Sequence, residues 1–274
     1  MSEFHVASRM QRHDLHKLHG LGNDFLLWFQ PALPSGASEL ATKWCNRSTG
    51  IGADGLIIAI DDRVAPQFVL FNADGSRAEV SGNGLRCFAH AIAARRGVDA
   101  LETLVATDAG DRSVRVTGAL LETSSVAVGM GAPHPGPSLE GIDLTAHLDF
   151  RQADTIDLGN PHVVIQVDDV RAHDMAVLGP AIEARFLPTG INVHLVTPTD
   201  SGLRMAIWER GVGVTAACGS GACAAAAIAS LARPDETEFV VEMPGGSATV
   251  LVSDELVLKG PSTSVAAVEP VSWS

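Results

Sequence analysis

The chain repeats itself at an offset of 137 residues, and this repeat constrains the fold more than any other feature. An internal repeat defines the architecture of a chain, so a fold assigned without it would be wrong. Three pairs correspond in order, namely Gly22-Asn23 with Gly159-Asn160, Asn72 with Glu209, and Ser81-Gly82-Asn83-Gly84 with Cys218-Gly219-Ser220-Gly221. Three matches at one offset indicate that the chain arose by duplication and folds as two similar halves.

Each half predicts the same order of elements, in which a hairpin and a Gly-rich turn lead into an Ala-rich helix. In the first half, the hairpin signal Asp74-Gly75 separates strands at 68–71 and 78–80. A helix at 83–95 follows and ends before Gly97. The second half repeats this order with a strand at 204–208, a turn at 211–213, and a helix at 221–232 stopped by Pro234.

The Ala-rich helices carry little polar surface and are therefore expected to be buried nearly all round. Many short Val-rich runs, such as residues 163–167 and 239–243, predict strands around them. We expect an α+β protein of two pseudo-symmetric half-domains, each a curved, mostly antiparallel sheet wrapped round a central buried helix. The predicted halves are residues 1–121, with 1–13 as a frayed extension, and residues 122–274, whose last strand returns to the first half.

Composition narrows the class of ligand. The formal net charge is −13, which is unlike the basic footprint of a nucleic-acid-binding surface, so a small polar ligand is expected instead. No stretch approaches the roughly 20 apolar residues that cross a bilayer, so no membrane partner is expected. The four cysteines are too few for a disulfide scaffold and have no zinc-binding spacing. We expect reduced thiols, a cytoplasmic location and no metal.

The duplication places Ser81 and Cys218 at equivalent helix entrances, and we expect them to face each other across a cleft between the halves. Unpaired backbone N–H groups at a helix N-terminus bind anions, and glycines there permit close approach of a carboxylate. Such amides also stabilise the charge that develops when the neighbouring carbon loses its proton. The helix terminus is expected to lower the Cys218 pKa from about 8.5 and to make the thiolate a base. Cys45, Cys87 and Cys223 are interpreted as core thiols.

Over most of its length, the sequence resembles the diaminopimelate epimerase family. Seven motifs in order carry the resemblance: KLHGLGNDF at 17–25, GIGADG at 50–55, FNADG at 71–75, GNGLRC at 82–87, LGNPH at 158–162, GINV at 190–193, and residues 209–223. The resemblance implies an isomerase that interconverts LL- and meso-diaminopimelate at the α-carbon without pyridoxal phosphate or another cofactor. It also implies a cytoplasmic homodimer in lysine and peptidoglycan-precursor biosynthesis.

The resemblance assigns roles to individual residues. The catalytic pair falls at Ser81 and Cys218. Backbone amides of Gly82, Asn83, Gly219 and Ser220 would hold the α-carboxylate, which agrees with the helix-entrance argument. The remaining substrate groups, chiefly at the distal centre, would bind to Asn23, Asn72, Asn160, Asn192, Glu209 and Arg210. His162 either polarises a catalytic thiol or serves as a scaffold residue.

Ser81 departs from the family, which has a cysteine at this position. A hydroxyl with a pKa near that of water, about 15.7, costs roughly 10 kcal/mol to ionise at neutral pH, whereas a helix terminus returns at most about 2 kcal/mol. Three hypotheses follow. The protein is an epimerase in which Ser81 relays a proton, a one-base dehydratase or lyase of a β-substituted amino acid, or an impaired amino-acid-binding homologue.

Overall fold

The computed structural model describes residues 10–11 and 13–269, so residues 1–9 and 12 of the expected extension lie outside the described residues. The chain forms two compact units, Met1–Val128 with Gly260–Ser274 and Gly129–Lys259. The chain leaves the first unit within a strand and returns to it within another. The predicted boundary at residues 121–122 falls just before the first of these strands, because a continuous strand carries no loop signal at the point of crossing.

The first unit is a sheet wrapped round one helix. Its elements are β1 (Leu15–Gly20), β2 (Asn23–Phe29), α2 (Ala37–Cys45), β3 (Gly55–Ile60), β4 (Gln67–Asn72), β5 (Arg77–Ala78), α3 (Gly82–Arg96), β6 (Ala100–Val105), β7 (Arg112–Thr117), most of β8 (Thr123–Gly131) and the end of β17 (Leu256–Val268). Strands β2 and β3 are parallel, whereas the pairs β1–β2, β1–β17, β3–β4, β4–β5, β6–β7 and β7–β8 are antiparallel. A bridge from Gln67 to Ala106 joins β4 to the chain just after β6.

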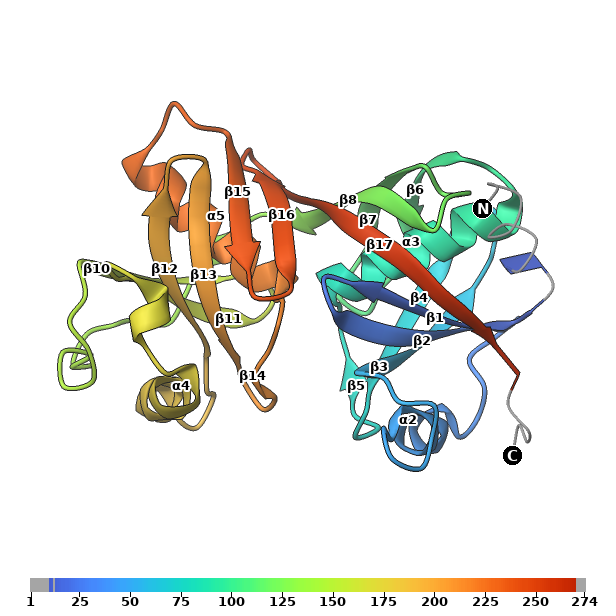
Figure 1. Ribbon diagram of the computed structural model, residues 1–274, viewed down its shortest axis with the longest axis horizontal. Coiled ribbons are helices and arrows are strands. Elements are labelled where there is room, and N and C mark those ends of the chain that lie inside the picture. The colour runs from blue at the N-terminus through green and yellow to red at the C-terminus, as the bar shows by residue number, and fades with distance from the viewer. Residues whose placement is uncertain (1–9, 12, 270–274) are drawn as a thin grey trace. The chain divides into compact units, whose positions relative to one another are not determined.

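Helix α3 contacts β1, β2, β3, β4, β6 and β7, and Figure 1 shows it lying among these strands. Residues 82–94 are all buried, which the small alanine side chains allow because they let strands approach the helix closely. The helix ends where Gly97 adopts φ 71°, a left-handed conformation that glycine accepts without strain. Helix α2 packs on the opposite face of the sheet through a core that includes Trp28 and Trp44.

The second unit repeats this arrangement. Its elements are β9 (His134–Pro135), β10 (Gln152–Asp157), β11 (Pro161–Gln166), η1 (Val170–Ala172), α4 (Met175–Glu183), η2 (Ala184–Phe186), β12 (Asn192–Thr199), β13 (Gly202–Glu209), β14 (Gly213–Val214), α5 (Gly219–Ala232), β15 (Glu238–Met243), β16 (Gly246–Leu251) and the start of β17. Helix α5 contacts β10, β11, β12, β13, β15 and β16. Helix α4 covers the other face of the sheet.

The duplication extends to strand register. Phe25 pairs with Gly55 between the parallel strands β2 and β3, and His162 pairs with Asn192 between the parallel strands β11 and β12, 137 residues further on. Because a slip of one residue would turn every side chain to the other face, a shared register means that equivalent positions face their central helices alike. The expected α+β class, with a buried helix in each of two similar halves, is confirmed.

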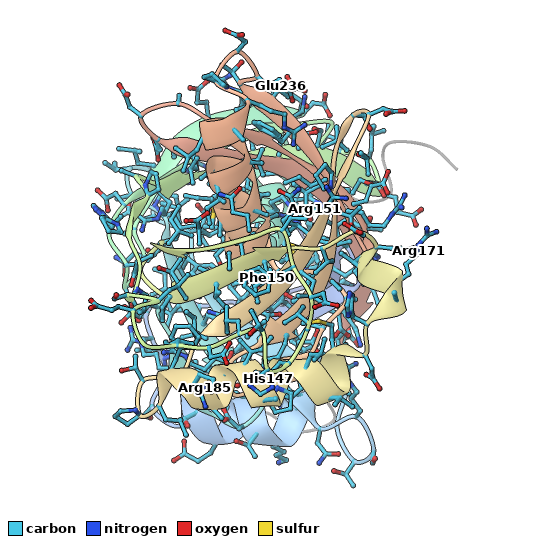
Figure 2. The ribbon with its side chains drawn as sticks, turned by 90° about the vertical axis from the view of Figure 1, so that its left-hand side faces the viewer. His147, Phe150, Arg151, Arg171, Arg185 and Glu236 are labelled. Atoms are coloured by element: carbon cyan, nitrogen blue, oxygen red, sulfur yellow. The ribbon has the colours of Figure 1, made fainter. Side chains whose placement is uncertain are left out.

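Arg151 and Arg171 of the second unit form ion pairs with acidic neighbours. Figure 2 labels Arg151 and Arg171, whose side chains form ion pairs with Asp168 and Asp169 at 2.5 and 2.9 Å. These cations are therefore already engaged and do not form an anion-binding cluster. In the described part of the chain, no helix combines the length and apolar content that a membrane span requires.

Candidate active site

Ser81 caps helix α3 in the first unit. Its extended backbone, with φ −140° and ψ 121°, precedes the first helical residue, and its Oγ accepts a hydrogen bond from the Gly84 amide at 3.1 Å. This bond satisfies the Gly84 amide, one of the first-turn amides that lack a partner within the helix itself. Ser81 is half-buried. The residue thus lies where the repeat predicted, at the positive end of a buried helix.

A chain of hydrogen bonds orients the amides beside this entrance. The Arg86 guanidinium, 0% exposed, donates to Oδ1 of Asn83 at 2.6 Å. Asn83 Nδ2 donates to Oδ1 of Asn23 at 3.1 Å, and Asn23 Nδ2 donates to Asp54 at 2.7 Å. Asp54 in turn pairs with Arg47. Two expected substrate ligands, Asn23 and Asn83, are therefore held by a network of the first unit itself.

Asn72 lies on the exposed edge of the same unit. It is the last residue of β4, and its Nδ2 donates to Ser76 Oγ at 3.0 Å across the turn that follows the strand. The turn is further tied by Asp74, which accepts from the Ser76 amide and hydroxyl. Asn72 is thus positioned by a turn that the Asp74-Gly75 signal had predicted.

Cys218 is the counterpart of Ser81 in the second unit. It precedes α5 with φ −127° and ψ 112°, and its Sγ accepts from the Gly221 amide at 3.4 Å. Its Sγ also lies 3.6 Å from Ser220 Oγ. The two helix entrances therefore share their backbone conformation and their capping hydrogen bond, although one cap is an alcohol and the other a thiol.

The expectation that the helix terminus lowers the pKa of Cys218 is wrong for this structure. The side chain is only 3% exposed, and burial together with the negative charge of Glu209 raises the pKa of Cys218 well above its usual range. The hydrogen bonds from Ser220 and Gly221 act in the opposite direction but are smaller causes. Desolvation disfavours the charged form more strongly than the helix terminus favours it, so Cys218 is a proton-bearing thiol.

Hydrogen bonds to neighbouring segments hold three further site residues in place, Asn192, Glu209 and Arg210. Thr215 Oγ1 donates to Glu209 Oε1 at 2.6 Å. Asn192 Nδ2 donates to the Pro161 carbonyl at 2.9 Å, and its Oδ1 accepts from the Arg210 amide at 3.0 Å. The buried Asn192 amide therefore uses both ends to join β11 to the segment after β13.

Asn160 and His162 belong to a second hydrogen-bonded chain. His162 Nε2 lies 3.0 Å from Asn160 Oδ1, and His162 Nδ1 lies 2.9 Å from Nε2 of His194. Burial and the charge of Arg210 lower the pKa of His162 well below its ordinary value, and burial lowers the pKa of His194 to about 3. Both rings are neutral. His162 is thus engaged on both nitrogens, which supports its reading as a scaffold residue.

Two glycines of the helix entrances are required by packing within their own units. A methyl group at Gly221 would overlap the His194 imidazole, and one at Gly84 would lie 3.2 Å from the Phe68 ring. Within each unit the first turn of the helix is pressed against a side chain from the surrounding sheet. The close approach of a ligand at these glycines stays a prediction.

Sequence reasoning missed Arg86, Asp54 and His194. The signal for Arg86 was an arginine in the middle of an Ala-rich helix, far from Arg95 and Arg96 at its C-terminal end, because a buried charge needs hydrogen-bond partners. His194 gave no local signal, since it occupies an ordinary strand position. Cys87, interpreted as a core thiol, is 0% exposed, and burial raises its pKa to about 12. Cys45 and Cys223 are likewise buried.

The chemistry available is acid–base chemistry on an anionic ligand. Each unit offers a helix entrance for a carboxylate, with a hydroxyl or a thiol at its cap. No group of three or more His, Cys, Asp or Glu side chains that could hold a metal is found among residues 10–11 and 13–269. Proton transfer next to a bound carboxylate is what these groups can perform.

Comparison with solved structures defines the class of fold. The chain matches a "Predicted Epimerase" from Pseudomonas aeruginosa with a TM-score of 0.72 at 16% identity, covering 95% of this chain and 99% of that one. It matches a "probable proline racemase" from Agrobacterium radiobacter K84 with a TM-score of 0.69 at 14% identity, covering 95% and 93%. The protein therefore has the fold of these epimerase- and racemase-like proteins.

Sequence comparison then gives the family. The family model for diaminopimelate epimerase matches residues 15–135 and 155–265. A diaminopimelate epimerase from Geobacillus sp. (strain WCH70) is 36% identical, covering 93% of this chain and 98% of its own length. One from Synechococcus elongatus is 35% identical, covering 91% and 95%. The chain belongs to the diaminopimelate epimerase family.

Proposed function

We propose that this protein is a cofactor-independent isomerase that interconverts LL- and meso-diaminopimelate by removing and returning the proton on the α-carbon. The observation that carries the proposal is the pair of equivalent helix entrances, capped by Ser81 and Cys218 at the two positions that the family uses for proton transfer. Family membership supports the substrate, because relatives that match over most of their length are diaminopimelate epimerases.

In the proposed reaction, both entrances act on one substrate. Backbone amides at Gly82, Asn83, Gly219 and Ser220 bind the α-carboxylate and stabilise the negative charge that forms when the adjacent carbon is deprotonated. Ser81 and Cys218 then serve opposite faces of the α-carbon. Amides in a water-excluded site need no reorganisation as the charge develops, which lowers the barrier without pyridoxal phosphate.

Cys218 begins one direction of the reaction as an acid. Its buried thiol carries the proton that it delivers to the carbanion, and the thiolate left behind is stabilised by the Gly221 amide and Ser220. In the other direction the thiol first needs an acceptor for its proton. Because Glu209 opposes the thiolate and is assigned to the substrate ammonium, water or another side chain accepts this proton in the proposed mechanism.

The two side chains of the proposed catalytic pair, Ser81 and Cys218, differ in acidity. An alcohol cannot act as a free-standing base at neutral pH, so in this mechanism Ser81 relays the proton through water or another side chain. This same residue favours a second candidate function. In that case Cys218 alone removes the proton and a β-substituent leaves, so that the enzyme is a dehydratase or lyase. An impaired amino-acid binder is the remaining outcome.

The distal end of the substrate would bind to polar side chains of both units. Arg210 suits a carboxylate because its guanidinium offers several donors, and Glu209 suits an ammonium as an acceptor. Asn23, Asn72, Asn160 and Asn192 complete this proposed set, and Asn192 also holds the Arg210 backbone. The setting that we propose is a cytoplasmic homodimer acting in lysine biosynthesis.

The test is incubation with LL-diaminopimelate in deuterated buffer under reducing conditions, without added cofactor. Loss of the α-proton together with meso product is the expected result. Proton loss with release of a β-substituent from a substituted amino acid, and no meso product, would replace epimerisation by elimination. A Ser81→Cys variant is run in parallel. A large gain in epimerisation would show that Ser81 limits the reaction, whereas absence of both exchange and product in both proteins would reject the proposal.

A further inference from the structure

His194 lies behind the helix entrance of the second unit and has no role in the proposed chemistry. It is the third residue of β12, two positions after Asn192, so both side chains lie on the same face of the strand. The ring is 0% exposed and lies directly against Gly221, in the first turn of α5. Its Nε2 is 2.9 Å from Nδ1 of His162. The repeat has Ile57 at the equivalent position, so a histidine is not needed to fill this space.

The hydrogen-bonded chain determines which nitrogens carry protons. Asn160 Oδ1 can only accept, so Nε2 of His162 carries a proton and donates to it at 3.0 Å. Because His162 is neutral, its Nδ1 has a lone pair and accepts from Nε2–H of His194. His194 is also neutral, which leaves a lone pair on its Nδ1. The direction of donation therefore runs from His194 through His162 to Asn160.

The far end of this chain agrees with that direction. Nδ1 of His194 is buried and has no hydrogen-bond partner among the described residues. A buried N–H without a partner is costlier and rarer than an unfilled acceptor. The first turn of α5, against which the ring packs, also carries the positive end of the helix dipole, which favours a lone pair over a proton at this nitrogen.

We propose that His194 is a positioning residue that, through His162, holds the Asn160 amide with its oxygen inward and its N–H group toward the ligand. Asn160 is half-buried, and with Oδ1 occupied, its Nδ2 is the end that a ligand meets. An amide N–H recognises a carboxylate, whereas an amide oxygen would repel it. The inference rests on the proposed function only in naming diaminopimelate as the source of that carboxylate.

The tautomer of His162 tests the chain without any substrate. In the ¹⁵N-labelled wild-type protein, nuclear magnetic resonance of the imidazole nitrogens is expected to show His162 protonated at Nε2 and His194 protonated at Nε2. A His162 proton on Nδ1 would overturn the proposal, because the Asn160 amide would then be reversed. This measurement stands whether or not the protein turns over diaminopimelate, so it separates failure of the relay from failure of the proposed function.

Variants test the effect on the ligand. His194→Ile installs the residue of the equivalent position in the first unit and removes the donor to His162. His194→Gln retains a donor at a place similar to that of imidazole Nε2. Loss of one oriented hydrogen bond to a carboxylate is expected to raise KM for LL-diaminopimelate about tenfold in His194→Ile, with kcat changed less, and His194→Gln is expected to restore most of the loss.

His90→Ile is the matched control. His90 is 0% exposed in the first unit and has both ring nitrogens within hydrogen-bond distance of protein groups, so it reproduces the loss of a buried histidine. Its KM is expected to equal that of the wild type. An equal rise in KM in His90→Ile and His194→Ile, or no rise in His194→Ile, would overturn the positioning role. If the wild type turns over no diaminopimelate, the tautomer of His162 alone decides the proposal.

Discussion

Ser81 and Cys218 accept the same capping hydrogen bond, from the third residue of the helix that each precedes. Their acidities nevertheless differ by several pKa units, because an alcohol is close to water and a thiol is not. The protein reduces this difference in acidity at Cys218, because burial and the charge of Glu209 raise the pKa of its thiol. Both caps therefore hold a proton at rest, and a neighbouring group is needed to take it up.

Removing the charge of Glu209 is expected to lower the pKa of Cys218. In Glu209→Gln the amide keeps an oxygen for Thr215 but no longer places a negative charge beside the thiol. More thiolate is then present at pH 8, so alkylation of Cys218 by iodoacetamide, followed by mass spectrometry across a range of pH, is expected to be faster. Glu242→Gln is the control, because Glu242 is paired with Arg204. Equal alkylation rates in all three proteins would contradict this assignment.

At the scale of elements, the central helix of each unit depends on close contact with the surrounding strands. Their alanines permit that contact, and a glycine of the first turn is packed against a side chain of the sheet. In α5 the turn presses on His194, and in α3 it meets Phe68 with slightly more room. The duplicated helices therefore differ in how much side-chain volume their entrances tolerate.

Gly221→Ala is expected to destabilise the protein more than Gly84→Ala. Alanine in a helix gains up to about 1 kcal/mol over glycine, but overpacking a tight core contact costs about 1–3 kcal/mol. At Gly84 the nearest neighbours lie at 3.2 Å and small adjustments suffice, whereas at Gly221 the His194 ring must move. Urea unfolding of the two variants, followed by circular dichroism, measures the difference. Equal midpoints would show that the His194 ring moves without cost.

At the scale of the whole molecule, several buried histidines make stability depend on pH. Burial lowers the pKa of His16 and of His90 to about 4 and that of His194 to about 3, and it lowers the pKa of His162 as well. In the unfolded chain each titrates near 6.5. The unfolded state therefore binds more protons as the pH falls below 6.5, and folding stability falls with it.

The protein is accordingly expected to lose stability between pH 6.5 and about 4. Within this window each buried histidine lowers the free energy of unfolding by up to about 1.4 kcal/mol for each pH unit of acidification, and above it the histidines have no such effect. Asp24, whose carboxyl is paired with Lys17 and Arg47, loses its contribution only at lower pH. Thermal unfolding at pH 7.5 and at pH 5 measures the loss, and His90→Gln is expected to lessen it. A midpoint that is constant over this range would contradict the prediction.

Much of the fold and of the helix entrances could be predicted because the relevant signals are local or repeated. The offset of 137 residues predicted equivalent elements, and the Ala-rich segments predicted buried helices. The places of Ser81 and Cys218 followed from glycine-rich turns before those helices. Positions of the site residues within each unit could thus be read from spacing and residue type, while their roles in binding remain predictions.

The amino-acid sequence by itself determined the duplication, the buried helices and the residue types at their entrances, because periodicity and capping act over a few neighbouring residues. The tertiary structure alone decided that the pKa of Cys218 is raised, that Asn192 joins β11 to the segment after β13, and that His194 donates toward Asn160. These outcomes depend on desolvation and on pairing between strands distant in sequence. Burial sets the cost of a charge, and strand register chooses each hydrogen-bond partner, so neither could be read from local composition.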